Sequence, residues 1–148
     1  MTKEAQALMH SLQSIATTLQ TLDDNEKRCC GVTLAQCHAL VEIGDQGSLS
    51  LRELAGKLGL DKSTLSRTVN NLVSQGYCLR QENPQDRRYV QIGLTAEGVR
   101  MYERVKLGMD RFYSDLYRAI PEEERSQVLR SAVLLLEAIR QAGCCYHP

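Results

Sequence analysis

The sequence predicts a mainly α-helical fold with one small β-ribbon. Along most of the 148-residue chain, apolar residues recur at spacings of three and four, which is the pattern of amphipathic helices. Two short β-prone runs, residues 77–82 and 89–94, flank the turn-forming segment Asn-Pro-Gln-Asp at residues 83–86. Short β-prone runs on either side of such a turn are typical of a hairpin. The expected architecture is therefore a compact group of helices and a hairpin, with longer helices at both ends.

Residues 51–76 carry the start and stop signals of two short helices joined by a tight turn. Ser50 and Glu53 form a capping box at the start of the first helix, and Gly59 ends it. Asp61 caps the second helix, and Gly76 ends it. The apolar faces consist of Leu51, Leu54, Ala55 and Leu58 in the first helix and of Leu65, Val69 and Leu72 in the second. Small residues at positions 55 and 59 allow the close crossing that a helix-turn-helix needs.

The outer face of the second helix carries hydrogen-bonding side chains and two cations but no acid. Ser63, Arg67, Asn70 and Ser74 form this face, and Lys62 and Ser66 flank it. An α-helix fits the major groove of DNA, where Arg, Asn and Ser bind base edges or phosphates. The alternative is an ordinary solvated face, and the preceding helix and turn favour DNA binding over it.

The hairpin strengthens the prediction of DNA binding. Val90, Ile92 and Leu94 alternate and are expected to point inward. Arg87 and Arg88 leave the turn together, so the tip of the ribbon could reach phosphates or the minor groove. The predicted DNA-binding residues are Lys62, Ser63, Ser66, Arg67, Asn70, Arg87 and Arg88. The resulting fold class is a winged helix-turn-helix with long N- and C-terminal dimerisation helices.

These features resemble the MarR family of winged-helix transcription regulators, and the resemblance covers nearly the whole chain. It rests on the core LRELAGKLGLDKSTLSRTVNNLVSQGY and on the wing DRRYVQIGLTAEG. The most specific signature is Asp86 and Arg88 followed by Leu94 and Thr95. The resemblance implies a homodimer that binds palindromic double-stranded DNA. It also implies that Asp86 orients the wing and that Arg88 enters the minor groove.

Charge and hydropathy suit a protein that binds DNA through one part only. The formal net charge is zero, yet residues 50–92 hold seven Lys or Arg against four Asp or Glu. No apolar run approaches the ~20 residues of a membrane span, and no signal peptide is visible, so we expect a cytoplasmic protein. The expected organisation is a single domain over 1–148, with a DNA-binding lobe at 33–95 and a dimerisation lobe formed by 1–30 and 96–148.

Three long amphipathic helices lie outside the predicted DNA-binding lobe. The first spans 4–22 and is followed by a polar connection at 23–28. Thr33 and Gln36 then form a capping box for a helix at 34–43 that Gly44 ends, and residues 45–49 form a loop. Thr95 caps a helix that runs to about residue 119, and Pro121 starts a last helix that runs to Gly143. The stripe of the helix after Thr95 consists of Val99, Tyr102, Val105, Met109, Phe112, Tyr113 and Leu116.

These stripes are too extensive for one small winged helix to cover, so we expect the terminal helices of two chains to interleave. An intramolecular bundle is the alternative.

Six cysteines in a chain expected to be cytoplasmic argue against a disulfide framework. The vicinal pairs Cys29-Cys30 and Cys144-Cys145, with His147 as a possible further ligand, predict a site for a soft metal or metalloid ion: As(III), Cd(II), Zn(II) or Cu(I). The alternatives are thiol-redox sensing, a small aromatic ligand bound near Tyr102, Phe112 and Tyr113, and solvent-facing pairs without a role. Cys37 and Cys78 lie in apolar patterns and are expected to be structural.

The function predicted from the sequence is a sequence-specific DNA-binding transcription regulator, a repressor whose DNA affinity an effector changes. A winged-helix module for protein interaction is the alternative, but the polar outer face and the arginines favour DNA. An enzyme based on Cys37 and His38 is excluded, because adjacent helical residues point about 100° apart and do not form a nucleophile–base pair.

Overall fold

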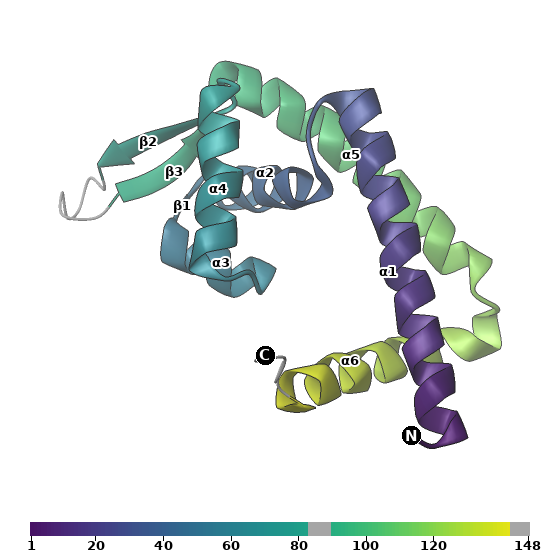
Figure 1. Cartoon of the computed structure of the whole chain (residues 1–148). Coiled ribbons are helices and arrows are strands. Elements are labelled where there is room, and N and C mark those ends of the chain that lie inside the picture. Colours follow the sequence, from purple (N-terminus) through teal and green to yellow (C-terminus); the bar gives the residue numbers. More distant parts are fainter. Residues whose placement is uncertain (83–89, 143–148) are drawn as a thin grey trace. The chain divides into compact units, whose positions relative to one another are not determined.

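The structure is a computed structural model that describes residues 1–82 and 90–142, without the side chains of residues 25–30. Its elements are α1 (Lys3–Cys30), α2 (Leu34–Gln46), β1 (Ser48–Ser50), α3 (Leu51–Leu58), α4 (Lys62–Ser74), β2 (Cys78–Glu82), β3 (Val90–Leu94), α5 (Ala96–Ala119), the 3-10 helix η1 (Glu122–Glu124) and α6 (Arg125–Ala142). Figure 1 shows long helices together with one small sheet beside α2, α3 and α4. The predicted mainly α-helical fold with a small β-wing is confirmed, and the dimerisation role of the terminal helices stays a prediction.

The chain divides into two compact units, residues 1–107 and residues 108–148. The first unit contains the helix-turn-helix and the sheet, whereas the second contains the rest of α5, η1 and α6. The finer division into a DNA-binding lobe at 33–95 and a dimerisation lobe at 1–30 and 96–148 stays a prediction.

The sheet is antiparallel and has three strands in the order β1-β3-β2. Leu49 of β1 and Arg80 of β2 both pair with Ile92 of the central strand. The sequence predicts only the two strands of the hairpin, and the predicted loop at 45–49 is wrong, because α2 continues to Gln46 and β1 begins at Ser48. Three residues are too few to show an alternating pattern, and β1 becomes a strand through its pairing with a distant one.

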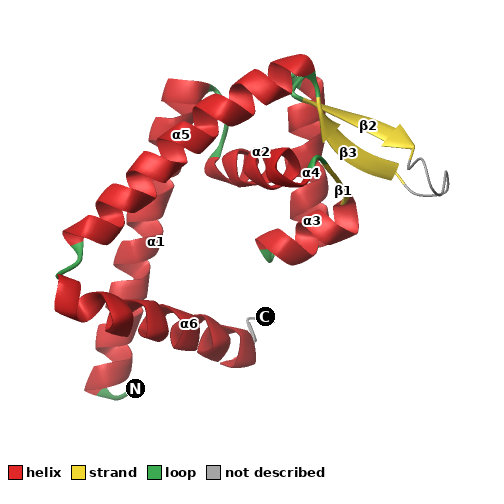
Figure 2. Cartoon of the chain, turned by 180° about the vertical axis from the view of Figure 1, so that it is seen from behind, coloured by secondary structure: helices red, strands yellow, loops and turns green. Residues whose placement is uncertain are grey.

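The core of the first unit lies between α2, α3, α4 and β3. Its largest fully buried side chains include Leu40, Ile43, Leu54, Leu65, Leu72 and Ile92. Ile92 therefore faces inward as predicted, but Val90 does not, since it is 50% exposed. Val90 pairs with Glu82 at the end of the hairpin that lies farther from the helices, as Figure 2 shows. No helix of the described residues covers that end of the ribbon, and alternation alone cannot reveal this.

The first helix is longer than predicted, because the polar segment 23–28 continues it to Cys30. Glu, Lys and Arg are good helix formers, so a polar run of this composition can continue a helix and does not by itself indicate a connection. Gly31, with a φ of +74°, follows the end of the helix. Asp23 lies within α1 and accepts a hydrogen bond from the amide of Leu34 at 2.5 Å, which joins α1 to the start of α2.

The second helix is also longer than predicted. The capping box of Thr33 and Gln36 is confirmed, but Gly47, not Gly44, ends the helix, and its φ is +84°. Gly44 is needed inside the helix because the ring of Tyr102 lies against it. A Cβ at this position would lie 2.3 Å from Cδ2 of Tyr102. Glycine is therefore needed at position 44 because the Tyr102 ring approaches the backbone closely there, and not because the helix ends.

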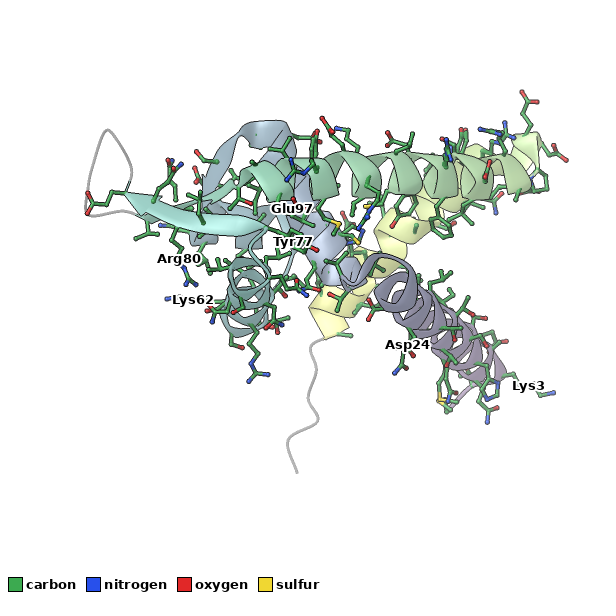
Figure 3. All side chains as sticks on the ribbon, turned by 90° about the horizontal axis from the view of Figure 1, so that it is seen from above. Lys3, Asp24, Lys62, Tyr77, Arg80 and Glu97 are labelled. Carbon is green, nitrogen blue, oxygen red and sulfur yellow. The ribbon has the colours of Figure 1, made fainter. Side chains whose placement is uncertain are left out.

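Thr95 and Gly98 fix the start of α5 against Gly76 and Tyr77, in the segment between α4 and β2. The hydroxyl of Thr95 donates to the carbonyl of Gly76 at 2.6 Å and accepts from the amide of Gly98 at 2.9 Å, which confirms the predicted cap. A Cβ on Gly98 would lie 1.8 Å from the carbonyl oxygen of Tyr77. Figure 3 labels Tyr77 and Glu97 where the segment after α4 meets the start of α5.

The face of α5 that packs in the first unit agrees with the predicted stripe only in part. Its buried residues are Gly98, Met101 and Val105, so the prediction for Val105 is confirmed, whereas Val99 is exposed. Because Gly98 has no side chain, apolar periodicity does not identify it as part of the buried face. The predicted face therefore starts at Val99, one residue after the observed one.

The second unit leaves its apolar side chains exposed. In α5 these are Phe112, Tyr113, Leu116 and Tyr117, and in α6 they include Val128, Leu129, Val133, Leu134, Leu136 and Ile139. Exposed apolar patches of this kind mark interaction surfaces in soluble proteins. Within the described residues, no helix is long and apolar enough to cross a membrane.

We expect Gly98→Ala to destabilise the protein, because its methyl group would meet a backbone carbonyl that cannot rotate away. Overpacking of this kind typically costs about 1–3 kcal/mol of unfolding free energy. Gly56→Ala in α3 is the matched control, since a Cβ there meets nothing within 4 Å. It should stabilise the protein by roughly 0.5–1 kcal/mol. Urea unfolding followed by circular dichroism measures both variants, and equal midpoints for Gly98→Ala and the wild type would contradict this packing.

Candidate nucleic-acid interface

Capping residues within the sequence determine where the two helices of the helix-turn-helix begin and where the first one ends. Ser50 and Glu53 form the predicted capping box of α3, and Gly59 ends that helix in the left-handed conformation with a φ of +62°. At the start of α4, the carboxylate of Asp61 accepts hydrogen bonds from the amides of Ser63 and Thr64 at 3.0 and 2.9 Å. These interactions confirm the three predicted signals and fix the point at which α4 begins.

The carboxylate of Asp61 also accepts from the hydroxyl groups of Ser63 and Thr64. Because these hydroxyls and the two amides all stabilise the charged form, they hold the pKa of Asp61 well below its usual range. Asp61 thus stays ionised at neutral pH, and its negative charge interacts favourably with the positive end of the helix dipole. The same contacts leave the hydroxyl of Ser63 engaged as a donor, so that it offers an acceptor to a ligand.

The predicted DNA-binding residues of α4 lie on its solvent face. Leu65, Thr68, Val69 and Leu72 are buried on the opposite face. Lys62, Ser63, Arg67 and Asn70 are exposed, and Ser66 is half-buried at the edge. The structure therefore brings the five predicted α4 residues together on one helix that is anchored by its other side.

The far end of α4 is held by a polar contact between distant segments. The side-chain amide of Gln36, which is 4% exposed, donates to Oε1 of Gln75 at 3.2 Å. Gln75 in turn donates to the carbonyl of Gly31 at 3.3 Å. Both ends of α4 are thus fixed, which is the property that a recognition helix needs.

Arg80 of β2 is a residue near this surface that the sequence analysis did not select. Its guanidinium Nη2 donates to Oδ1 of Asn70 at 2.5 Å. The sequence offered one weak signal, because Arg80 is among the cations that give residues 50–92 their positive balance. Which helix a strand side chain reaches depends on how the ribbon packs, and that is a tertiary property.

The tip of the wing lies outside the described residues. Asp86, Arg87 and Arg88 belong to the segment 83–89, so their predicted roles stay predictions. The described parts of β2 and β3 pair in register from Cys78 with Leu94 to Glu82 with Val90.

The predicted cysteine site also falls mostly outside the described residues. Cys144, Cys145 and His147 follow Ala142, and the side chains of Cys29 and Cys30 are not described. The backbone places Cys29 and Cys30 in the last turn of α1 rather than in a loop, so the loop prediction for this pair is wrong. In the described part of the chain, no group of three or more His, Cys, Asp or Glu side chains could hold a metal ion.

Cys37 and Cys78 are buried, as predicted. Burial raises the pKa of the Cys78 thiol to about 11. At neutral pH this thiol is protonated, and its 2% exposure closes it to solvent. Cys78 is therefore a core residue rather than a ligand.

A cavity of about 380 Å³ lies between the end of α1, the start of α2 and the turn after α3. It is lined by Asp23, Thr33, Leu34, Ala35, His38, Leu58 and Leu60. Burial lowers the pKa of His38, so its neutral form is favoured at neutral pH. None of the three aromatic residues predicted to line a ligand pocket borders this cavity: Tyr102 packs on Gly44, and Phe112 contacts Tyr113 edge to face.

Comparisons with known proteins agree on one family. The family model described as the MarR family matches residues 32–90. The "HTH-type transcriptional repressor MdtR" of Bacillus subtilis is 30% identical over 130 residues, which covers 86% of this chain and 83% of that protein.

Two solved structures show the same fold bound to DNA. The S. aureus MepR–DNA complex superposes with a TM-score of 0.78 at 23% identity, and the match covers 88% of this chain and 97% of that one. A mutant MarR from E. coli complexed with operator DNA gives a TM-score of 0.72 at 25% identity, and covers 92% of this chain and 96% of that one. The curated relatives are described as transcription regulators rather than enzymes.

Proposed function

This chain belongs to the MarR family, and we propose that it is a transcription repressor that binds palindromic double-stranded DNA as a homodimer. The observation that carries the proposal is the exposed face of α4. It is free of acidic side chains, it is capped at its start by Asp61, and it is fixed at its end through Gln75. The similarity to MdtR, which is described as a repressor, supports the direction of regulation. Such a regulator acts in the cytoplasm, where the DNA is.

The proposed recognition mode follows from the shape and charge of α4. A single helix fits the major groove, and the side chains on its solvent face can bind base edges and phosphates. Arg67 is exposed on this face and carries the positive charge nearest its centre. In this proposal Lys62 and Ser66 bind backbone phosphates, and Arg87 and Arg88 extend the contact from the wing into the flanking minor groove.

The proposed dimer covers the apolar faces that the chain leaves exposed. Leu129, Ala132, Leu136 and Ile139 follow helical spacing along α6 and make one continuous stripe. None of the residues of α6 is buried. A second copy of the chain supplies the same stripe, and twofold symmetry would set two α4 helices about 34 Å apart, one turn of DNA.

For the effector we propose a soft metal or metalloid ion held by Cys29, Cys30, Cys144 and Cys145, with His147 as a possible further ligand. Vicinal thiolates are suited to As(III), Cd(II), Zn(II) or Cu(I). The position of Cys29 and Cys30 at the end of α1, next to the joint with α2, supports a link between ion binding and the position of the helix-turn-helix. Thiol oxidation of the same pairs is the alternative. The cavity beside His38 favours a second alternative, a small organic ligand.

We expect Arg67→Ala to weaken DNA binding. If Arg67 binds a phosphate, the slope of log affinity against log salt falls by about one unit. If it binds a base, preference at that position relaxes by roughly 1–3 kcal/mol. Arg118→Ala removes the same charge from an exposed ion pair with Asp115 and is the control. Fluorescence anisotropy with a duplex selected from a random library measures both, and wild-type binding by the double variant Arg67→Ala/Arg88→Ala would remove the DNA-binding proposal.

We expect Leu136→Glu to dissociate the dimer, because it places a charge within the stripe of α6. Gln127→Glu is the matched control. Gln127 is exposed and polar, and it lies about 180° away from Leu136 around the helix. Sedimentation at micromolar concentration should give a dimer for the wild type and for Gln127→Glu, and a monomer for Leu136→Glu. A compact monomer for the wild type would show that the proposed architecture is wrong.

We expect replacement of Cys144 and Cys145 by Ser to abolish the response to soft metals while leaving DNA binding intact. The measurement is a titration of As(III), Cd(II), Zn(II) and Cu(I) against the protein–DNA complex, together with elemental analysis of the purified protein. The variant Cys78→Ser, which alters a buried thiol outside the proposed site, is the control. Unchanged metal affinity and unchanged DNA release in the double variant would rule out the cysteine site without affecting the proposal for α4.

A further inference from the structure

Arg80 holds Asn70, one of the residues on the solvent face of α4, from a neighbouring strand. Both side chains are exposed, and guanidinium Nη2 lies 2.5 Å from Oδ1 of Asn70. Figure 3 shows Arg80 reaching from β2 toward the side of α4 that also carries Lys62. The contact joins β2 to the exposed face of α4 and places a third cation, Arg80, beside Lys62 and Arg67.

The chemistry of the contact determines how the Asn70 amide is oriented. A guanidinium group offers only hydrogen-bond donors, so the amide atom that faces it must be the carbonyl oxygen. The amino group of Asn70 then points away from Arg80 and has two N–H donors to offer. Arg80 itself has further N–H donors, so the pair presents donors on its outer side.

This orientation changes which base Asn70 can bind. An asparagine that recognises adenine uses both ends of its amide, because it accepts from N6 and donates to N7. Arg80 takes one of the two lone pairs of the accepting oxygen, and its positive charge disfavours the approach of the adenine amino group to the other. Guanine shows two acceptors, N7 and O6, on its major-groove edge, and these match the N–H donors that Asn70 and Arg80 present.

We propose that Arg80 is a positioning residue that turns Asn70 into a donor for guanine and disfavours adenine at the same position. The inference deepens the proposed function, because it rests on α4 lying in the major groove. Asn70 lies seven residues after Ser63 and three after Arg67, on the line that runs along the middle of the exposed face. That position favours a base over a phosphate as its partner, and the experiment separates the two.

The test compares base preferences of full-length variants. Duplexes selected from a random library by the wild type define its site, and a second selection with Asn70→Ala shows which position loses its preference. At that position the wild type should prefer guanine to adenine by about 5- to 150-fold, the range of one good bidentate contact. Arg80→Ala should reduce this ratio several-fold there and nowhere else, because the amide of Asn70 is then able to turn.

Two controls isolate the effect from loss of charge and from loss of folding. Arg52→Ala removes an exposed cation from α3, and it should alter affinity without altering the guanine-to-adenine ratio at the Asn70 position. Asn71→Ala removes an exposed amide from the adjacent position of α4, and it should leave that ratio unchanged. Because the ratio is measured within one protein sample, it does not depend on the folded fraction.

Several results would overturn the inference. Arg80→Ala could instead lower DNA affinity, reduce the slope of log affinity against log salt by about one unit and leave the guanine preference unchanged. That result would show that Arg80 binds a phosphate. A wild-type preference for adenine at the Asn70 position, or the absence of any position that depends on Asn70, would also refute it. Failure of the wild type to bind any duplex would overturn the proposed function and this inference with it, whereas the other results leave the function standing.

Discussion

The contact between Gly98 and the carbonyl of Tyr77 is the constraint on which the arrangement of the first unit depends. At this point the end of α4, the start of β2 and the start of α5 meet, and no side chain fits between them. The hydroxyl of Thr95 closes the joint, because it binds the carbonyl of Gly76 and the amide of Gly98 together. A displacement of the first turn of α5 must therefore move Tyr77, and with it the segment that connects the recognition helix to the wing.

A second joint connects α5 to α2 through Gly44, Asp45, Tyr102 and Lys106. The ring of Tyr102 lies on Gly44, and its hydroxyl donates to Asp45 at 2.6 Å. Lys106 forms an ion pair with Asp45 and lies over the ring of Tyr102. Hydrogen bonding with Asp45 raises the pKa of Lys106, and hydrogen bonding with Lys106 and Tyr102 lowers that of Asp45, so both groups are charged at neutral pH. With two joints, the part of α5 in the first unit (96–107) is fixed both in position and in rotation relative to α2 and the segment after α4.

This arrangement explains how a signal could reach the DNA-binding surface without a contact to it. The recognition helix is held at its start by Asp61, at its end by Gln75 and along its side by Arg80. These contacts leave it little freedom to move alone, so the proposed effector would have to displace the winged helix as a whole. Allosteric control requires differential contacts in two such arrangements. The cavity beside His38 and the cysteines at the end of α1 both lie next to the α1–α2 connection, where a small displacement would be transmitted.

The sequence by itself determined the elements whose causes are local. Capping boxes, the Asp61 cap and the left-handed Gly59 act over two to four residues, so α3 and α4 and the exposed face of α4 could be predicted residue by residue. Tertiary structure decided whatever depends on a distant neighbour. Gly44 is required by the ring of Tyr102, and Gly98 by the carbonyl of Tyr77. The strand β1 forms because it pairs with β3, and Arg80 reaches the exposed face of α4 because it contacts Asn70. Periodicity records which side of an element is apolar. It carries no information on which partner covers that side or how closely two backbones approach.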